Sequence, residues 1–189
     1  MTKAALRKIY KEKRKQISPA DQERWTDLIL INFQKSDLPF INCVHTYLAI
    51  ENQNEVETGN ITRYLSFKNP GLKIVVPKIN LDQGEMKHYI FNDDVEMASN
   101  SFGIIEPVGG EKINASEIDL VITPLLAFDK EGYRVGYGKG FYDKFFMQCN
   151  KDVIRVGLSF FDAEEIIEDT DAYDIPLHYC ITPHSVYTF

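Results

Sequence analysis

Short β-rich runs alternate with amphipathic segments along this chain, and that alternation constrains its fold more than any other feature. Three of the runs are apolar enough to be interior strands, at residues 43–50, 73–79 and 118–124. Continuous apolar runs of this length are typical of strands that are covered on both faces. Further strands are expected at 86–91, 153–160 and 177–183, and helices at 2–18, 18–34, 55–67 and 141–149.

The first two helices are predicted from their periodicity and their starts. Leu6 and Tyr10 lie on one face of the first helix, with basic residues around the rest. Ser18 is placed to cap the second helix, Pro19 suits its first position, and Asp21 stands where a capping-box acid would stand. Strands alternating with helices predict a single α/β domain over residues 1–189, with a mostly parallel central sheet flanked by helices on both faces.

Composition narrows the class of protein. The net charge of −7 argues against general nucleic-acid binding, and no segment is apolar enough for a membrane span or a signal peptide. Three cysteines, an odd number without close pair spacing, suit a reducing compartment and indicate neither a disulfide framework nor a zinc site. A cytoplasmic protein is expected, and a monomer, since no interface helix is evident.

The densest glycine stretch is "GYRVGYGKGFYDKFF", residues 132–146. It matches neither familiar phosphate loop. A dinucleotide fingerprint that starts at Gly136 would need glycine where Phe141 stands. A P-loop would need glycine at Tyr133 and Ser or Thr at Gly140. The stretch nevertheless follows a buried strand and precedes a helix, where ligands of open α/β sheets bind.

The residues among these glycines indicate what the loop binds. Arg134 and Lys139 place two cations beside backbone amides that glycine leaves bare, as a polyphosphate requires. Phe141 and Tyr142 offer flat apolar surface to a planar ring, and Asp143 is a possible magnesium ligand. The loop therefore predicts a nucleotide phosphate bound with a metal, although a strain-relieving turn would explain the glycines alone.

The sequence resembles the 5-formyltetrahydrofolate cyclo-ligases, also called methenyltetrahydrofolate synthetases. The resemblance runs nearly end to end. Its most specific part is "TPLLAFDKEGYRVGYGKGFYDKFF", and "KAALRKIYKEKRKQIS", "NEVET", "VVPKI", "GIIEP" and "VGLSFF" stand in the family's order. It implies a fold like that of sugar-phosphate isomerases and CoA-transferases. It also implies an ATP- and Mg²⁺-dependent enzyme of one-carbon metabolism, with 5-formyltetrahydrofolate, free or polyglutamylated, as the substrate that is closed to 5,10-methenyltetrahydrofolate.

The resemblance also assigns roles to residues of this sequence. Arg134 and Lys139 are implied as catalytic, and Asp143 and Asp174 as metal ligands. The ATP contacts are Lys3, Ala4, Ala5, Leu6, Arg7, Arg134, Val135, Gly136, Tyr137, Gly138, Lys139, Gly140, Phe141 and Tyr142, and the folate contacts are Ile50, Glu55, Tyr137, Gly138, Lys139, Gly140 and Phe141.

Other interpretations of the same residues stay open. Charged helix faces are usually only solvated, which is the expectation for Arg14 and its neighbouring lysines 8, 11, 13 and 15. Glu55 could be a helix-start acid, Asp171 competes with Asp174, and His45 is expected to be a hydrogen-bonded core residue. A sugar-phosphate isomerase, an acyl-CoA transferase or a non-catalytic folate-binding protein are the alternative functions.

Overall fold

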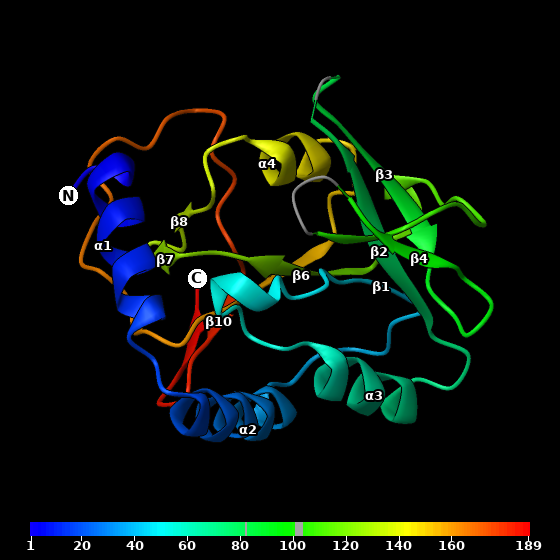
Figure 1. Cartoon of the computed structure of the whole chain (residues 1–189), viewed down its shortest axis with the longest axis horizontal. Coiled ribbons are helices and arrows are strands. Elements are labelled where there is room, and N and C mark those ends of the chain that lie inside the picture. The colour runs from blue at the N-terminus through cyan, green and yellow to red at the C-terminus, as the bar shows by residue number, and fades with distance from the viewer. Residues whose placement is uncertain (82, 101–103) are drawn as a thin grey trace.

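A seven-stranded sheet organises the molecule (Figure 1). The computed structural model describes residues 1–81, 83–100 and 104–189. The strands stand in the order β11-β10-β9-β6-β1-β2-β3. Their bounds are β1 Cys43–His45, β2 Lys73–Asn80, β3 Glu85–Ile90, β6 Leu120–Pro124, β9 Ile154–Leu158, β10 Tyr179–Ile181 and β11 Val186–Thr188.

The sheet is mostly parallel, as the alternation of strands and helices predicts. β2, β1, β6, β9 and β10 pair in parallel, and only the edge strands β3 and β11 run antiparallel to their neighbours. β11 was not predicted, because three residues beside the "TPHS" turn carry little periodic signal. The strand expected at 43–50 is wrong beyond His45: the ladder ends there, and the chain leaves the sheet.

Helices cover both faces of the sheet. α2 (Pro19–Lys35) and α3 (Gly59–Lys68) lie on one face, and α4 (Phe141–Phe146) lies on the other (Figure 1). Side chains alternate accordingly along β6. Leu120 and Ile122 join the core cluster beside α2 and α3, whereas Val121 joins the cluster of α4.

The helix starts follow local capping chemistry. Ser18 caps α2, its Oγ accepting the Asp21 amide hydrogen at 3.1 Å, and Pro19 takes the first position, which confirms the prediction. α3 starts at Gly59 instead of Glu55, because Glu55 and Thr58 are engaged elsewhere: Thr58 Oγ1 donates to the Tyr47 carbonyl at 2.9 Å. α4 ends three residues earlier than predicted.

α1 (Lys3–Lys15) lies at one end of the sheet, beside a small hairpin of β7 (Ala127–Phe128) and β8 (Arg134–Val135) (Figure 1). Leu6 and Tyr10 pack there with Leu126 and Val135. A second hairpin joins β4 (Met97–Ser99) to β5 (Ile105–Pro107). Two short 3₁₀ helices, Glu51–Gln53 and Ala115–Glu117, complete the described elements.

The strand order reverses between β1 and β6. From β1 the chain adds β2 on one side, then returns to add β6, β9 and β10 on the other. The loops after β1 and β6 therefore diverge at their carboxyl ends, and a crevice opens between them. Open α/β sheets bind their ligands at this point.

Candidate functional site

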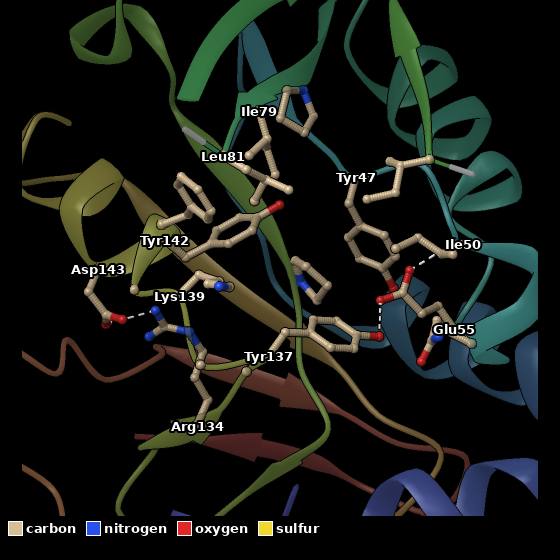
Figure 2. A pocket seen from close by; sticks show the side chains of 18 of the residues that line it. Tyr47, Ile50, Glu55, Ile79, Leu81, Arg134, Tyr137, Lys139, Tyr142 and Asp143 are labelled. Carbon is tan, nitrogen blue, oxygen red and sulfur yellow. Dashed lines mark hydrogen bonds and ion pairs between the residues drawn. The ribbon is translucent and has the colours of Figure 1, made fainter. Parts of the chain in front are cut away.

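A pocket of about 550 Å³ opens where the strand order reverses. Its walls come from α1, the loops after β1 and β6, the end of β2, and β5. It is large enough for a drug-sized ligand. Figure 2 shows its side chains, many of them directed toward a common space. The lining residues are Lys3, Arg7, Lys11, Tyr47, Leu48, Ile50, Gln53, Glu55, Pro77, Ile79, Leu81, Ile104, Ile105, Glu106, Pro124, Arg134, Gly136–Tyr142, Asp143 and Asp174.

One wall of the pocket is cationic and comes from α1. Lys3, Arg7 and Lys11 line it, spaced by four residues so that they share one helix face. Arg7 Nε donates to the Gly136 carbonyl at 2.9 Å, and Lys3 Nζ forms an ion pair with Asp174. Lys11 was expected to be solvated; it is exposed, and it lines the pocket as well.

The glycine loop runs against this cationic helix. Gly138 has a φ of +90°, and a Cβ added there would lie 3.2 Å from Arg7 Cζ and Nε. Only glycine meets both conditions without strain. Gly140 also has a positive φ and forms the N-terminal cap of α4. Figure 2 shows the Lys139 side chain pointing from this loop toward the middle of the pocket.

Arg134 lies behind the loop, in contact with one of the predicted metal ligands. Its side chain is only 6% exposed, with Nη1 donating to the Ile175 carbonyl at 2.5 Å and Nη2 to Asp143 Oδ1 at 2.8 Å (Figure 2). The guanidinium stacks 4.8 Å from the ring centre of Phe146. Burial lowers the pKa of Arg134, and Asp143 opposes that shift. The cation is therefore fixed in place by three partners.

Two carboxylates, Asp143 and Asp174, border the pocket beside this arginine. The Ile175 amide, next to Asp174, donates to Asp143 Oδ1 at 3.2 Å, so the chain brings the two residues together. Within residues 1–81, 83–100 and 104–189, no three His, Cys, Asp or Glu side chains form a metal-type cluster. Two carboxylates with room for phosphate and water oxygens fit Mg²⁺. Asp171 does not line the pocket: its Oδ1 accepts the Tyr173 amide hydrogen at 2.8 Å, and its own amide donates to Asp174 Oδ2 at 2.7 Å.

The far end of the pocket holds a buried acid. Glu55 is 3% exposed; its Oε1 accepts from the Tyr137 hydroxyl at 2.6 Å and its Oε2 from the Ile50 amide at 2.8 Å (Figure 2). Burial and the nearby Glu55 raise the pKa of Tyr137 above its ordinary value. Glu55 therefore contacts two other residues that the resemblance implies as folate contacts. Tyr137 is 82 residues away in the sequence, and Ile50 is five residues away.

Apolar side chains from β2, β5 and the loop after β1 line the rest of the pocket, and sequence reasoning did not assign them. They include Tyr47, Leu48, Ile79, Leu81 and Ile105. Glu106 Oε1 accepts the Ile79 amide hydrogen at 2.9 Å and so ties β5 to β2. The signal was available in part, since "VVPKI" and "GIIEP" contain Pro77, Ile79, Ile105 and Glu106. The lining residues not predicted as contacts are Lys11, Tyr47, Leu48, Gln53, Pro77, Ile79, Leu81, Ile104, Ile105, Glu106 and Pro124.

Four predicted ATP contacts do not line the pocket. Leu6 and Val135 are fully buried in the core between α1 and the β7–β8 hairpin. Ala4 and Ala5 lie on the exposed surface of α1. A contiguous run on a helix faces all directions, so only the residues spaced like Lys3 and Arg7 reach the pocket.

A histidine on the α4 face of the sheet differs from the expectation of a hydrogen-bonded core residue. His45 is fully buried, and neither ring nitrogen has a partner among the described residues. His88 lies beside it, with ring centres 5.2 Å apart, and stacks on Phe145 at 4.2 Å. Burial lowers the pKa of His45 well below its ordinary value and that of His88 to about 4. Both rings are therefore neutral at pH 7.

The fold and the pocket together define a class: an α/β protein that presents a cation-lined glycine loop and a buried acid in one crevice at the strand-order reversal. The sequence model of the 5-formyltetrahydrofolate cyclo-ligase family matches residues 1–183, and the chain belongs to that family.

Named relatives agree with the family match. The chain is similar to 5-formyltetrahydrofolate cyclo-ligase of Haemophilus influenzae, with 39% identity over 48% of this chain and 52% of that protein. With the Mycoplasma pneumoniae cyclo-ligase it shares 29% identity over 85% of this chain and 86% of the relative. The matches thus span about half of the first relative and most of the second. The solved structure of Aquifex aeolicus 5,10-methenyltetrahydrofolate synthetase superimposes with a TM-score of 0.79 at 30% identity, covering 100% of this chain and 93% of that one.

Proposed function

We propose that this protein converts 5-formyltetrahydrofolate and ATP into 5,10-methenyltetrahydrofolate, ADP and phosphate. One observation carries the proposal beyond the family match. A single pocket is lined by the cations of α1 and the glycine loop at one end and by Glu55 with apolar walls at the other. A reaction that joins a phosphate donor to a planar, partly apolar acceptor needs both ends in one space.

The cationic end suits the triphosphate. Lys3, Arg7 and Lys139 would neutralise phosphate oxygens, and the backbone N–H groups of Gly138 and Gly140 would donate hydrogen bonds to them. Lys139 is the exposed cation of the loop, so it is the group we assign to the transferring phosphoryl group. Arg134, being engaged on three sides, would act by holding Asp143.

The cationic end of the pocket would also hold Mg²⁺. Asp143 and Asp174 would hold the ion, each now paired with a cation that the ion would replace or share. When bound, Mg²⁺ supplies charge neutralisation for the polyphosphate. The same two carboxylates also fix the positions of Lys3 and Arg134.

The buried-acid end suits the folate. A carboxylate such as Glu55 can accept paired hydrogen bonds from the amino and ring N–H edge of a pterin, which orients the ring as well as binding it. Ile50, Phe141 and Tyr142 offer apolar surface to the planar ring. The formyl group would then face the glycine loop.

The proposed reaction takes place in two steps, phosphoryl transfer and then ring closure. The formyl oxygen attacks the γ-phosphorus, an O–P bond forms, and the bond to the β-phosphate oxygen breaks to release ADP. Nitrogen 10 then attacks the activated carbon, phosphate leaves with the former formyl oxygen, and nitrogen 10 loses its proton. The residues of this chain align the two substrates and neutralise charge during transfer.

A turnover assay tests the proposal. Purified protein is mixed with 5-formyltetrahydrofolate, ATP and Mg²⁺, and absorbance of the methenyl product is followed together with release of ADP. The proposal expects equal amounts of both products. Folate binding without turnover would instead indicate a non-catalytic binding protein, and no folate binding at all would exclude both.

A further inference from the structure

Arg14 is a cation of α1 that no pattern in the sequence distinguishes from its neighbours. It was expected to be solvated like the lysines around it, but it is only 4% exposed, and that expectation is wrong. Lys13 and Lys15 on either side of it are exposed. A buried guanidinium is unfavourable unless its surroundings compensate it, so its partners deserve a functional explanation.

The partners of Arg14 lead to the buried acid of the pocket. Nη1 donates to the Tyr137 hydroxyl at 3.1 Å, and that hydroxyl donates to Glu55 Oε1 at 2.6 Å. Nη2 donates to the Leu125 carbonyl, directly after β6. A guanidinium can only donate, so it forces the Tyr137 proton toward Glu55. The direction of the whole chain of hydrogen bonds follows from Arg14.

The positive charge of Arg14 also supports a role in holding Glu55. Glu55 is nearly fully buried, and Arg14 is the cation connected to it through one hydroxyl. The Ile50 amide occupies the other carboxylate oxygen. Arg14 thus holds Glu55 as an oriented acceptor and compensates its charge without occupying its remaining lone pairs.

The position along α1 separates this role from phosphate binding. Residues 3, 7 and 14 lie within about 40° of one another around the helix, and Arg14 lies about 16 Å along the axis from Lys3. Lys3 contacts Asp174 and Arg7 contacts Gly136, whereas Arg14 contacts Tyr137. One helix therefore serves the two ends of the pocket with different cations.

We propose that Arg14 is a positioning residue that sets Glu55 for recognition of the pterin edge, acting through the Tyr137 hydroxyl. The inference rests on the proposed function, because it takes Glu55 as the folate contact. Hydrogen bonds to charged groups are strong enough that losing this one weakens folate binding about tenfold. ATP binding changes by less than about twofold, since Lys3, Arg7 and Lys139, which we assign to the triphosphate, lie at the other end of the pocket.

Calorimetric titration tests this on the whole protein, with 5-formyltetrahydrofolate and a non-hydrolysable ATP analogue as separate ligands. Arg14→Met removes the charge, and Arg14→Lys keeps it while losing one of the two hydrogen bonds; the lysine variant should recover part of the folate affinity. Lys15→Met, an exposed cation one residue on, is the matched control and should leave both affinities unchanged. Thermal melting reports whether each variant is folded.

A double-mutant cycle with Tyr137→Phe gives the decisive comparison. If Arg14 acts through the hydroxyl, Arg14→Met weakens folate binding no further once Tyr137 is phenylalanine. A full tenfold loss in that background, or an equal loss for both ligands, would show a merely structural role. Wild-type protein that binds no folate would defeat the proposed function, whereas normal wild-type binding with an unaffected Arg14→Met variant would defeat this inference alone.

Discussion

Replacing Gly138 by alanine is expected to weaken ATP binding more than any other glycine change in the loop. The φ of +90° is unfavourable for an L side chain, which costs roughly 1–2 kcal/mol. The added Cβ would also lie 3.2 Å from Arg7 Cζ and Nε, so Arg7 must move and lose its 2.9 Å hydrogen bond to Gly136, worth about 1 kcal/mol. ATP must restore the bound geometry of the loop, so its dissociation constant should rise about 30- to 150-fold.

Gly140→Ala is the matched control for this prediction. Its φ is +67°, but no atom of the described residues lies within 4 Å of the added Cβ, so only the backbone cost of roughly 1–2 kcal/mol applies and a loss of about fivefold to thirtyfold is expected. Gly59→Ala, outside the site and without contacts, reports the general effect of the exchange. Titration with a non-hydrolysable ATP analogue measures all three. Equal losses for Gly138 and Gly140 would refute the role of Arg7, and unchanged affinity in both would refute the phosphate loop.

Three further changes test other parts of the site and core. Lys139→Ala should lower kcat by about 10²-fold or more while the protein still binds folate, as stopped-flow turnover would report, and an unchanged kcat would contradict its assignment. Asp143→Asn should raise the Mg²⁺ concentration needed for half-maximal turnover; the same requirement in variant and wild type would remove it from the metal site. The pKa of His88 is about 4 when folded and 6.5 when unfolded, so the unfolded state binds more protons between these values, and stability falls as pH drops below 6.5. At 1.36 kcal/mol per pH unit, His88→Phe should lose about 2 kcal/mol less than wild type between pH 7 and pH 5 in urea unfolding, whereas equal losses would show that His88 is already protonated or paired.

Local patterns were sufficient for the parts of the fold that depend on local chemistry. The parallel core strands follow from apolar runs, and the start of α2 follows from Ser18 and Pro19. The strand that begins at Cys43 was predicted too long. The segment "TYLAI" has the composition of a strand, but it forms part of the pocket wall, and the other parts of that wall come from distant parts of the chain. The two-residue strands β7 and β8 are too short to carry any period.

In the candidate site, too, the residues predictable from the sequence are those that depend on local patterns. The glycine loop and its cations were evident from composition and spacing within a few residues. The resemblance supplied Glu55 and Ile50, but not the contact between Glu55 and Tyr137, which lie 82 residues apart. Burial of Arg14 was invisible among flanking lysines, since only the packing of α1 against the loop after β6 distinguishes it. Side chains that meet only in the folded chain leave no periodic trace in the sequence.

The fate of the formyl oxygen tests the central claim most directly. 5-Formyltetrahydrofolate carrying ¹⁸O in its formyl group is converted with ATP and Mg²⁺, and the released phosphate is examined by mass spectrometry. Transfer of the phosphoryl group to that oxygen predicts one ¹⁸O atom in each phosphate formed with the methenyl product. Unlabelled phosphate accompanying the same amount of product would contradict the account, because ATP would then be hydrolysed without activating the folate.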